Sequence, residues 1–276
     1  MFWHKPKPEP VKPPINWENV WLNVAIPTSR GVHPQTIMTF MRLAEALQER
    51  GARTHRLSFS TLSSVAIARG FLAKRFLEDL DMTHLLQLDD DISCDPEVVI
   101  RMIEAGLPMV GCTYRQRRKD GGVMYPLLAS ESQQKVRPGP DGTAVVDGIP
   151  GGLTLWRREA IEELDDATPR VDCQGTVVCG FYFERVRPNG LYVSEDYSSC
   201  DRWRELGHEV RLLVDATISH HDANTAWRGN YKESWGIRLL PQLDAGPLAD
   251  RTRNGQIVGA IDPETDPTEG DEEAST

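Results

Sequence analysis

Apolar runs alternate with helix-like patterns along the first half of the chain. Runs typical of buried strands occupy residues 20–27, 54–59, 84–88 and 109–113. Between them, apolar side chains recur at helical spacing, as in the stretch from Pro34 to Gly51. Strands that alternate with helices in this order form a mostly parallel sheet with helices on both faces. We therefore predict an α/β, Rossmann-like fold with a mostly parallel central sheet flanked by helices.

The second half of the chain has a less regular pattern. Glycines and prolines at residues 137–142 indicate a loop or a hairpin. Helices are predicted at residues 158–164 and 195–206, and the apolar run at residues 210–214 is predicted to be the final strand. His220 follows shortly after that run. We expect an irregular half packed against the regular one.

Both ends of the chain differ in composition from its middle. Residues 1–15 are rich in proline and lysine and are expected to form an extended arm. Residues 241–276 contain nine acidic and two basic side chains and are expected to be a disordered tail. This tail carries −7 of the formal net charge of −10, so the rest of the chain is near −3. One domain is therefore expected at residues 16–240. Its near-neutral charge gives no general electrostatic attraction for a polyanion.

Cysteine usage and hydropathy favour a cytoplasmic protein. The five cysteines form no C-x-x-C pair, and their odd number favours reduced thiols, although Cys173 and Cys179 could pair across a hairpin. The first fifteen residues contain no apolar core of a signal peptide. No apolar run approaches the length of a membrane span.

Three consecutive aspartates, Asp89–Asp91, follow the predicted strand at residues 84–88. Their mutual repulsion has to be offset by a basic side chain or a metal ion. Carboxylates in a D-x-D pattern suit Mg²⁺ or Mn²⁺, which are held by one or two carboxylates together with substrate phosphates. A turn capped by these side chains is the alternative, but Asp95-Pro96 already supplies the start of the next helix.

Three further features have both a structural and a chemical interpretation. Arg69 could pair with a diphosphate or could be an ordinary surface arginine. Glu195 and Asp196 open a predicted helix, where they could stabilise its N-terminus or act on an acceptor hydroxyl as a general base. His220 could be a structural histidine or could add a nitrogen ligand to a metal site.

The order of these features resembles the GT-A fold glycosyltransferases, in particular the family-two-like group common in bacteria and phages. Four segments within residues 20–230 carry the resemblance: VAIPT, IARGFLAKRFLED before THLLQLDDDI, GGLTLWRREAIEEL, and SEDYSSCDRWRELGHEVRLLVDATISHHD. The chain departs from the family at Gly70, where the family commonly has asparagine after Ala-Arg. The resemblance implies a GT-A type fold with a donor half at about residues 16–115 and an acceptor half at about residues 116–240.

The resemblance also implies roles for single residues. Asp91 would hold the divalent metal, Mn²⁺ or Mg²⁺, and His220 would be a further metal contact, with the neighbouring His221 as the alternative. On the acceptor side, Asp196 would be the catalytic base, and Glu195 is the second candidate. The residues that would bind a UDP-sugar or GDP-sugar donor are Thr28, Arg30, Arg69, Asp89, Asp90, Gly151 and Gly152.

These assignments predict a metal-dependent transfer of a sugar from a nucleoside-diphosphate donor to a hydroxyl group. Inversion follows if Asp196 has direct access to the acceptor, and a retaining outcome stays open. Two alternatives are a sugar-nucleotide nucleotidyltransferase and a non-catalytic carbohydrate-binding protein on a decayed transferase fold. The nucleotidyltransferase would need a glycine-rich basic loop after the first strand, and IPTSRGVHP contains one glycine.

The acceptor class stays open between modified DNA, a glycan or lipid-linked sugar, and a protein. A basic run that comprises Arg115, Arg117, Arg118 and Lys119 could meet an anionic acceptor such as DNA. Runs of this length are more often solvated loops, and the near-neutral body of the chain disfavours DNA.

Overall fold

The computed structural model describes residues 15–52, 54–62, 64–116, 123–129, 136, 138–222 and 225–234. The predicted tail at residues 241–276 lies outside this range, as does the predicted arm except for Ile15. Ile15 is partly buried against the apolar core, so it belongs with the domain.

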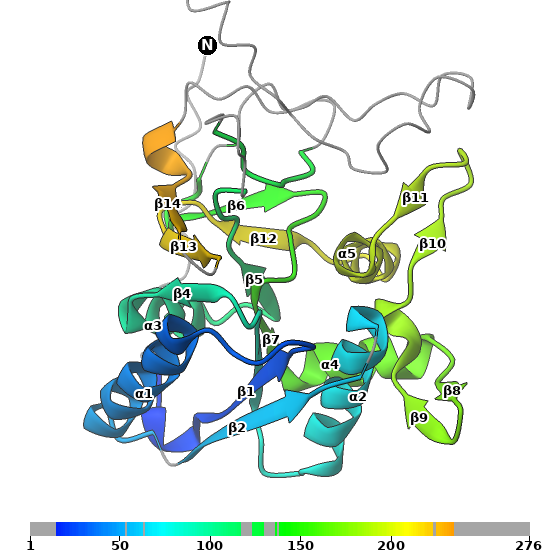
Figure 1. The fold of residues 1–276 in the computed structure, drawn as a ribbon, viewed down its shortest axis with the longest axis horizontal. Coiled ribbons are helices and arrows are strands. Elements are labelled where there is room, and N and C mark those ends of the chain that lie inside the picture. Colours follow the sequence, from blue (N-terminus) through cyan, green and yellow to red (C-terminus); the bar gives the residue numbers. More distant parts are fainter. Residues whose placement is uncertain are drawn as a thin grey trace, which may run out of the picture.

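A seven-stranded sheet forms the centre of the molecule (Figure 1). Its strand order is β2-β1-β3-β7-β5-β12-β6. β7 and β6 run antiparallel to the other five strands, which all point the same way. The strands are β1 (Trp21–Pro27), β2 (Thr54–Ser60), β3 (His84–Leu88), β5 (Met109–Gly111), β6 (Thr143–Val146), β7 (Leu153–Arg157) and β12 (Val210–Leu213). The prediction of a mostly parallel central sheet is confirmed.

Helices cover both faces of this sheet and enclose two apolar clusters (Figure 1). Side chains of a strand point alternately to the two faces, so Val24 of β1 packs with one set of helices and Ala25 with the other. The first set comprises α1 (Pro34–Glu49) and α3 (Pro96–Glu104). The second comprises α2 (Val65–Glu78), α4 (Arg158–Ala167) and α5 (Glu195–Glu205). The predicted α/β class with flanking helices is therefore confirmed.

A second, antiparallel sheet corrects the prediction that residues 210–214 form the final strand. β13 (Thr217–His221) and β14 (Ala226–Asn230) follow β12, and β13 pairs with the short β4 (Ile92–Cys94) directly after the aspartates. His220 thus lies on a strand, opposite Ile92. The sequence TISHH hid this strand because Ile218 is its only apolar residue, so no apolar alternation is visible.

Shorter elements complete the part of the chain that the structure describes. They are η1 (Trp17–Asn19), η2 (Gly180–Tyr182), η3 (Lys232–Ser234), and two small hairpins, β8 (Val171–Cys173) with β9 (Thr176–Val178) and β10 (Arg185–Val186) with β11 (Tyr192–Val193). No helix within the described residues is long and apolar enough to cross a membrane.

Candidate active site

The aspartates Asp89–Asp91 form the turn between β3 and β4, at the carboxyl end of the central strands. The backbone N–H of Asp89 donates to the carbonyl of Gly152 at 2.9 Å. The carbonyl of Asp90 accepts from the backbone N–H of His33 at 2.7 Å and from Thr36 Oγ1 at 3.1 Å. The start of α1 and the loop before β7 therefore fix the turn, and Asp95 independently caps α3 by accepting from Glu97 N–H. In open α/β sheets this strand edge is where ligands bind.

Arg69 is the basic side chain that offsets the negative charge of Asp89. It extends from α2, its side chain is 3% exposed, and its Nη2 lies 2.6 Å from Asp89 Oδ1. Its Nη1 lies 2.9 Å from Glu195 Oε1 at the start of α5. One guanidinium thus joins two carboxylates that are 106 positions apart in the chain. The alternative of an ordinary surface arginine does not describe this buried residue.

In this cluster one arginine faces several carboxylates, and the pKa values of Arg69 and Glu195 both depart from their usual values. Burial favours a neutral guanidine, but the charges of Asp89, Glu195 and Asp196 raise the pKa of Arg69 above its usual value, so it stays charged. Burial, followed by the charges of Asp196 and Asp89, raises the pKa of Glu195 from 4.5 to about 7 against the opposing effect of Arg69. Glu195 can therefore exchange a proton near neutral pH, which suits a general acid or base.

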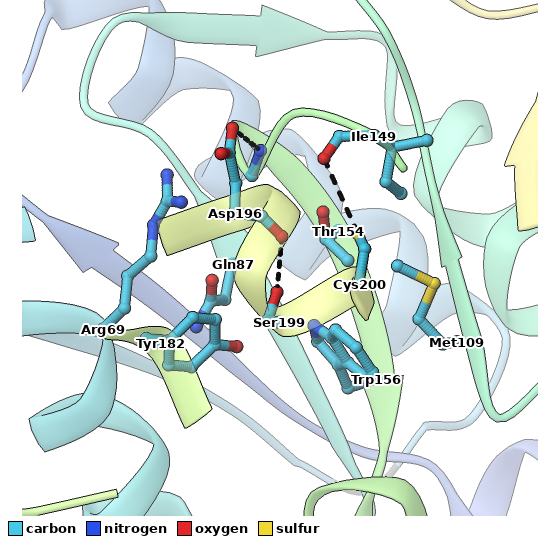
Figure 2. Close-up of a pocket in the computed structure, with 11 residues that line it drawn as sticks. Arg69, Gln87, Met109, Ile149, Thr154, Trp156, Tyr182, Asp196, Ser199 and Cys200 are labelled. Atoms are coloured by element: carbon cyan, nitrogen blue, oxygen red, sulfur yellow. Dashed lines mark hydrogen bonds between the residues drawn. The ribbon is translucent and has the colours of Figure 1, made fainter. Parts of the chain in front are cut away.

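Asp196 lies beside Glu195 but is held by different groups. Its Oδ1 accepts from the Ser194 hydroxyl and, at 2.8 Å, from the backbone N–H of Tyr197. Its Oδ2 accepts from the backbone N–H of Gly151 at 3.2 Å. Asp196 therefore both caps the first turn of α5 and connects that helix to the glycine loop, as Figure 2 shows.

Gly151 and Gly152 are required by close packing. A Cβ on Gly151 would overlap the guanidinium of Arg69, and a Cβ on Gly152 would lie 2.6 Å from the ring of Tyr114. Any side chain at either position would displace a residue of the site. The two glycines therefore let the backbone pass directly over Arg69 and Tyr114.

Asp91 and His220 face each other across the second sheet. The Oδ2 of Asp91 and the Nε2 of His220 lie 3.6 Å apart. The other ring nitrogen, Nδ1, lies 3.4 Å from the carbonyl of Arg115, which can only accept a hydrogen bond. In the tautomer that carries its proton on Nδ1, the lone pair of Nε2 points toward the Asp91 carboxylate. A histidine arranged in this way is prepared to bind a cation at Nε2.

The neighbouring histidines His220 and His221 contact different groups. Successive residues of a strand point to opposite faces. His221 Nε2 lies 2.7 Å from Ser93 Oγ, and its ring stacks on His33 at 4.4 Å. Its backbone N–H donates to the carbonyl of Asp91 at 2.7 Å. His221 therefore supports the aspartate turn, while His220 faces the carboxylate.

Among the described residues, Asp91 and His220 are the side chains placed to contact a metal ion at this position. Within the described residues, no set of three or more His, Cys, Asp or Glu side chains is arranged to hold a metal ion. A carboxylate and an imidazole still fit Mg²⁺ or Mn²⁺, because these ions commonly keep waters and bind substrate phosphates. Asp91 and His220 are thus suited to share an ion with a bound diphosphate.

The remaining predicted residues lie around this centre with fewer contacts. Thr28 is nearly buried after β1, and its hydroxyl accepts from the backbone N–H of Gly31 at 3.0 Å. Arg30 is exposed in the same loop. In the basic run, Arg115 is described, whereas the structure does not describe residues 117–119. The proposed anionic contact therefore stays a prediction.

Tyr114 is a site residue that was not among those predicted from the sequence. Its ring lies edge-on to His220 with a centroid separation of 5.0 Å and also packs against Gly152. Burial, followed by the charges of Asp89 and Asp196, raises the pKa of its hydroxyl well above the usual value. Nothing in the local sequence pattern distinguishes this tyrosine from its neighbours or predicts its contacts with His220 and Gly152.

No protein-family profile matches the sequence. No curated protein matches it either. Among solved structures, A197 from STIV superposes with a TM-score of 0.47 and 16% identity, over 76% of this chain and 95% of that one. The inositol-1-phosphate CTP transferase from T. maritima gives a TM-score of 0.38 and 11% identity, over 75% and 91%. A glycosyltransferase involved in the glycosylation of the major capsid of PBCV-1 gives 0.31 and 12%, over 52% and 63%.

Proposed function

We propose that this protein is a GT-A type glycosyltransferase that moves a sugar from a nucleoside-diphosphate donor to a hydroxyl acceptor. The observation that carries the proposal is the arrangement around Arg69, whose guanidinium joins Asp89 of the D-x-D turn to Glu195 of the E-D-Y helix start. On the other side of the same turn, Asp91 faces His220. Motifs that are distant in the sequence therefore meet at the strand edge where α/β proteins bind ligands.

A divalent cation bound by Asp91 and His220 would offset the charge that develops on the leaving diphosphate. The protein groups around it have separate tasks in this proposal. Asp89 and Asp90 bind the donor, with Thr28 and Arg30 at the same edge. Arg69 holds Asp89 in a fixed orientation and carries a positive charge next to the diphosphate. Gly151 and Gly152 form the backbone surface on which the donor sugar lies.

Asp196 is the proposed base that takes the proton of the acceptor hydroxyl. Its Oδ2 lies beside the glycine loop and makes a long hydrogen bond of 3.2 Å, which an acceptor hydroxyl could replace. Glu195 is the second candidate, and its pKa near neutrality supports that role. If Asp196 acts directly on the acceptor, the reaction is a single displacement with inversion.

The decisive assay is the release of nucleoside diphosphate from UDP- and GDP-sugars in the presence of Mn²⁺, followed by mass analysis of products. We expect Asp91→Asn to raise the Mn²⁺ concentration for half-maximal activity by more than about tenfold, while the fold is retained. Asp95→Asn is the matched control, since this aspartate caps α3 and asparagine caps nearly as well. An unchanged Mn²⁺ dependence in Asp91→Asn would remove Asp91 from the metal site.

The same assay separates the two alternatives. A nucleotidyltransferase would release pyrophosphate from a nucleoside triphosphate and a sugar phosphate. A non-catalytic carbohydrate-binding protein would bind donor or sugar without turnover. Either result, with no release of nucleoside diphosphate, would contradict the proposed function.

A further inference from the structure

A small pocket lies beside Arg69, and Gly151 and Asp196 of the candidate active site are among the residues that line it (Figure 2). Arg69 of α2, Gln87 of β3, Tyr182 of η2, and Ser199 and Cys200 of α5 also line it. Arg69 is 2% exposed, and Gln87 and Tyr182 are each 1% exposed. The pocket is therefore part of the interior rather than of the surface.

Three buried polar atoms of this pocket have no hydrogen-bond partner among the described residues. They are Arg69 Nε, Gln87 Nε2 and Tyr182 Oη. All three carry hydrogen and can donate. Buried polar groups in native proteins are almost always paired with protein atoms or ordered water. Three such donors around one pocket are therefore not an ordinary apolar packing arrangement.

Neighbouring protein acceptors are already engaged. Both carboxylate oxygens of Asp196 accept hydrogen bonds from Ser194, Tyr197 and Gly151. The backbone carbonyl of Asp196 accepts from Ser199 Oγ at 2.7 Å. Since Arg69 Nε, Gln87 Nε2 and Tyr182 Oη have no partner among the described residues, an occupant that pairs them must supply its own acceptor atoms.

The charge around the pocket decides which acceptor fits. The single positive charge of Arg69 is shared by Asp89 and Glu195, and Asp196 lies next to the same guanidinium. An additional anion would face three carboxylates with one cation. A neutral molecule of small size avoids this repulsion, and water both accepts and donates hydrogen bonds.

We propose that this pocket is a binding site for ordered water, which accepts hydrogen bonds from Arg69 Nε and Gln87 Nε2 and bonds to the hydroxyl of Tyr182. Such water would link Arg69 Nε to Gln87 of β3 and Tyr182 of η2, while Arg69 Nη2 and Nη1 bond to Asp89 and Glu195. The proposal depends on the buried donors and the charges around them and on no step of the sugar transfer, so it stands or fails independently of that activity.

The sign of a stability change tests the proposal. If Tyr182 Oη is bonded to ordered water, Tyr182→Phe removes a satisfied group and should lower Tm by about 2–4 °C. If the hydroxyl has no partner, the same change removes an unsatisfied buried group, and Tm should stay the same or rise. Tyr231→Phe is the matched control, because Tyr231 is also buried but lies outside the pocket. A Tm of Tyr182→Phe at or above that of the wild type would overturn the proposal.

A crystal structure of the full chain provides a test without any substitution. We expect ordered water within hydrogen-bond distance of at least two of Arg69 Nε, Gln87 Nε2 and Tyr182 Oη. Direct bonds from these donors to protein carbonyls, or an anion in the pocket, would show that the site is not a water site.

Discussion

At the scale of single residues, the site depends on the unequal sharing of one positive charge. Arg69 is bonded to Asp89 and Glu195, and Asp196 adds a third carboxylate next to it. The Glu195 side chain is more buried than that of Asp89, and burial together with the neighbouring carboxylates raises the pKa of Glu195 to about 7. The protonation state of Glu195 should therefore control both stability and activity near neutral pH.

This charge distribution predicts how stability depends on pH. The pKa of Glu195 is about 7 in the folded protein and 4.5 when unperturbed, so the folded state binds the proton more tightly between these values. Its contribution to the free energy of unfolding is full below about pH 4.5 and is lost as pH rises through about 7. Denaturant melts of the wild type and Glu195→Gln at several pH values will measure this contribution of Glu195 to the free energy of unfolding. We expect the wild type to lose stability relative to Glu195→Gln between about pH 5 and pH 8. A constant difference would show that Glu195 has an ordinary pKa.

An experiment can separate the proposed role of Asp196 as the base from its role as a cap of α5. If it only caps α5, Asp196→Asn should cost roughly 1 kcal/mol or less and leave the turnover of the folded enzyme nearly intact. If it is the base, the same change should keep donor affinity and lower the transfer rate by roughly 10²–10⁴-fold. Donor affinity, Tm and transfer rate should be measured on one preparation. A normal rate with a lowered Tm would move the assignment of the base to Glu195.

At the scale of elements, η2 and β9 approach α2 closely at Gly70. The carbonyl of Cys179 lies against Gly70, and the backbone N–H of Cys179 donates to the Gly70 carbonyl at 3.2 Å. An asparagine side chain after Arg69 would have no room. The glycine thus lets the segment that carries Tyr182 pack directly on the helix that carries Arg69.

Gly70→Ala tests this packing. Replacing a helical glycine by alanine should stabilise the helix by about 1 kcal/mol. Here the new Cβ would overlap the Cys179 carbonyl, and such overpacking costs about 1–3 kcal/mol. We therefore expect a net loss of up to about 2 kcal/mol in the free energy of unfolding, measured by denaturant melts. Gly139→Ala is the control. Its new Cβ would lie nearest a side-chain atom, Asp141 Oδ1 at 3.2 Å, and not a backbone carbonyl as at Gly70. A stability gain in Gly70→Ala would show that the two segments can move apart.

At the scale of the whole molecule, two sheets bring the site together. The central sheet aligns the ends of β1 and β3, and the second sheet returns β13 to the aspartate turn through its pairing with β4. The acidic sequence after residue 240 contributes most of the net charge but little apolar surface. The arrangement of the candidate site should therefore depend on the second sheet and be independent of this acidic segment.

Two deletions separate these contributions. Removing residues 241–276 should change Tm by less than about 2 °C and leave donor turnover unchanged, because the segment lacks the apolar content to join a core. Removing residues 226–276 also removes β14, which pairs with β13 along its whole length, and should lower both Tm and activity. Thermal melts and the nucleoside-diphosphate assay will compare them. A large loss from the shorter deletion would place the acidic segment in the folded domain.

The sequence by itself determined the elements whose signals are local. The apolar runs predicted β1 and β3, and Asp95-Pro96 predicted the start of α3, because strand burial and helix capping depend on neighbouring residues. It also indicated that Asp89–Asp91 need a positive partner. Only the tertiary structure identified that partner for Asp89 as Arg69, brought the ring of His220 rather than that of His221 to the Asp91 carboxylate, and placed Tyr114 beside the site. These facts depend on sheet order and on pairing between distant strands, and such contacts leave no periodic pattern in a single sequence.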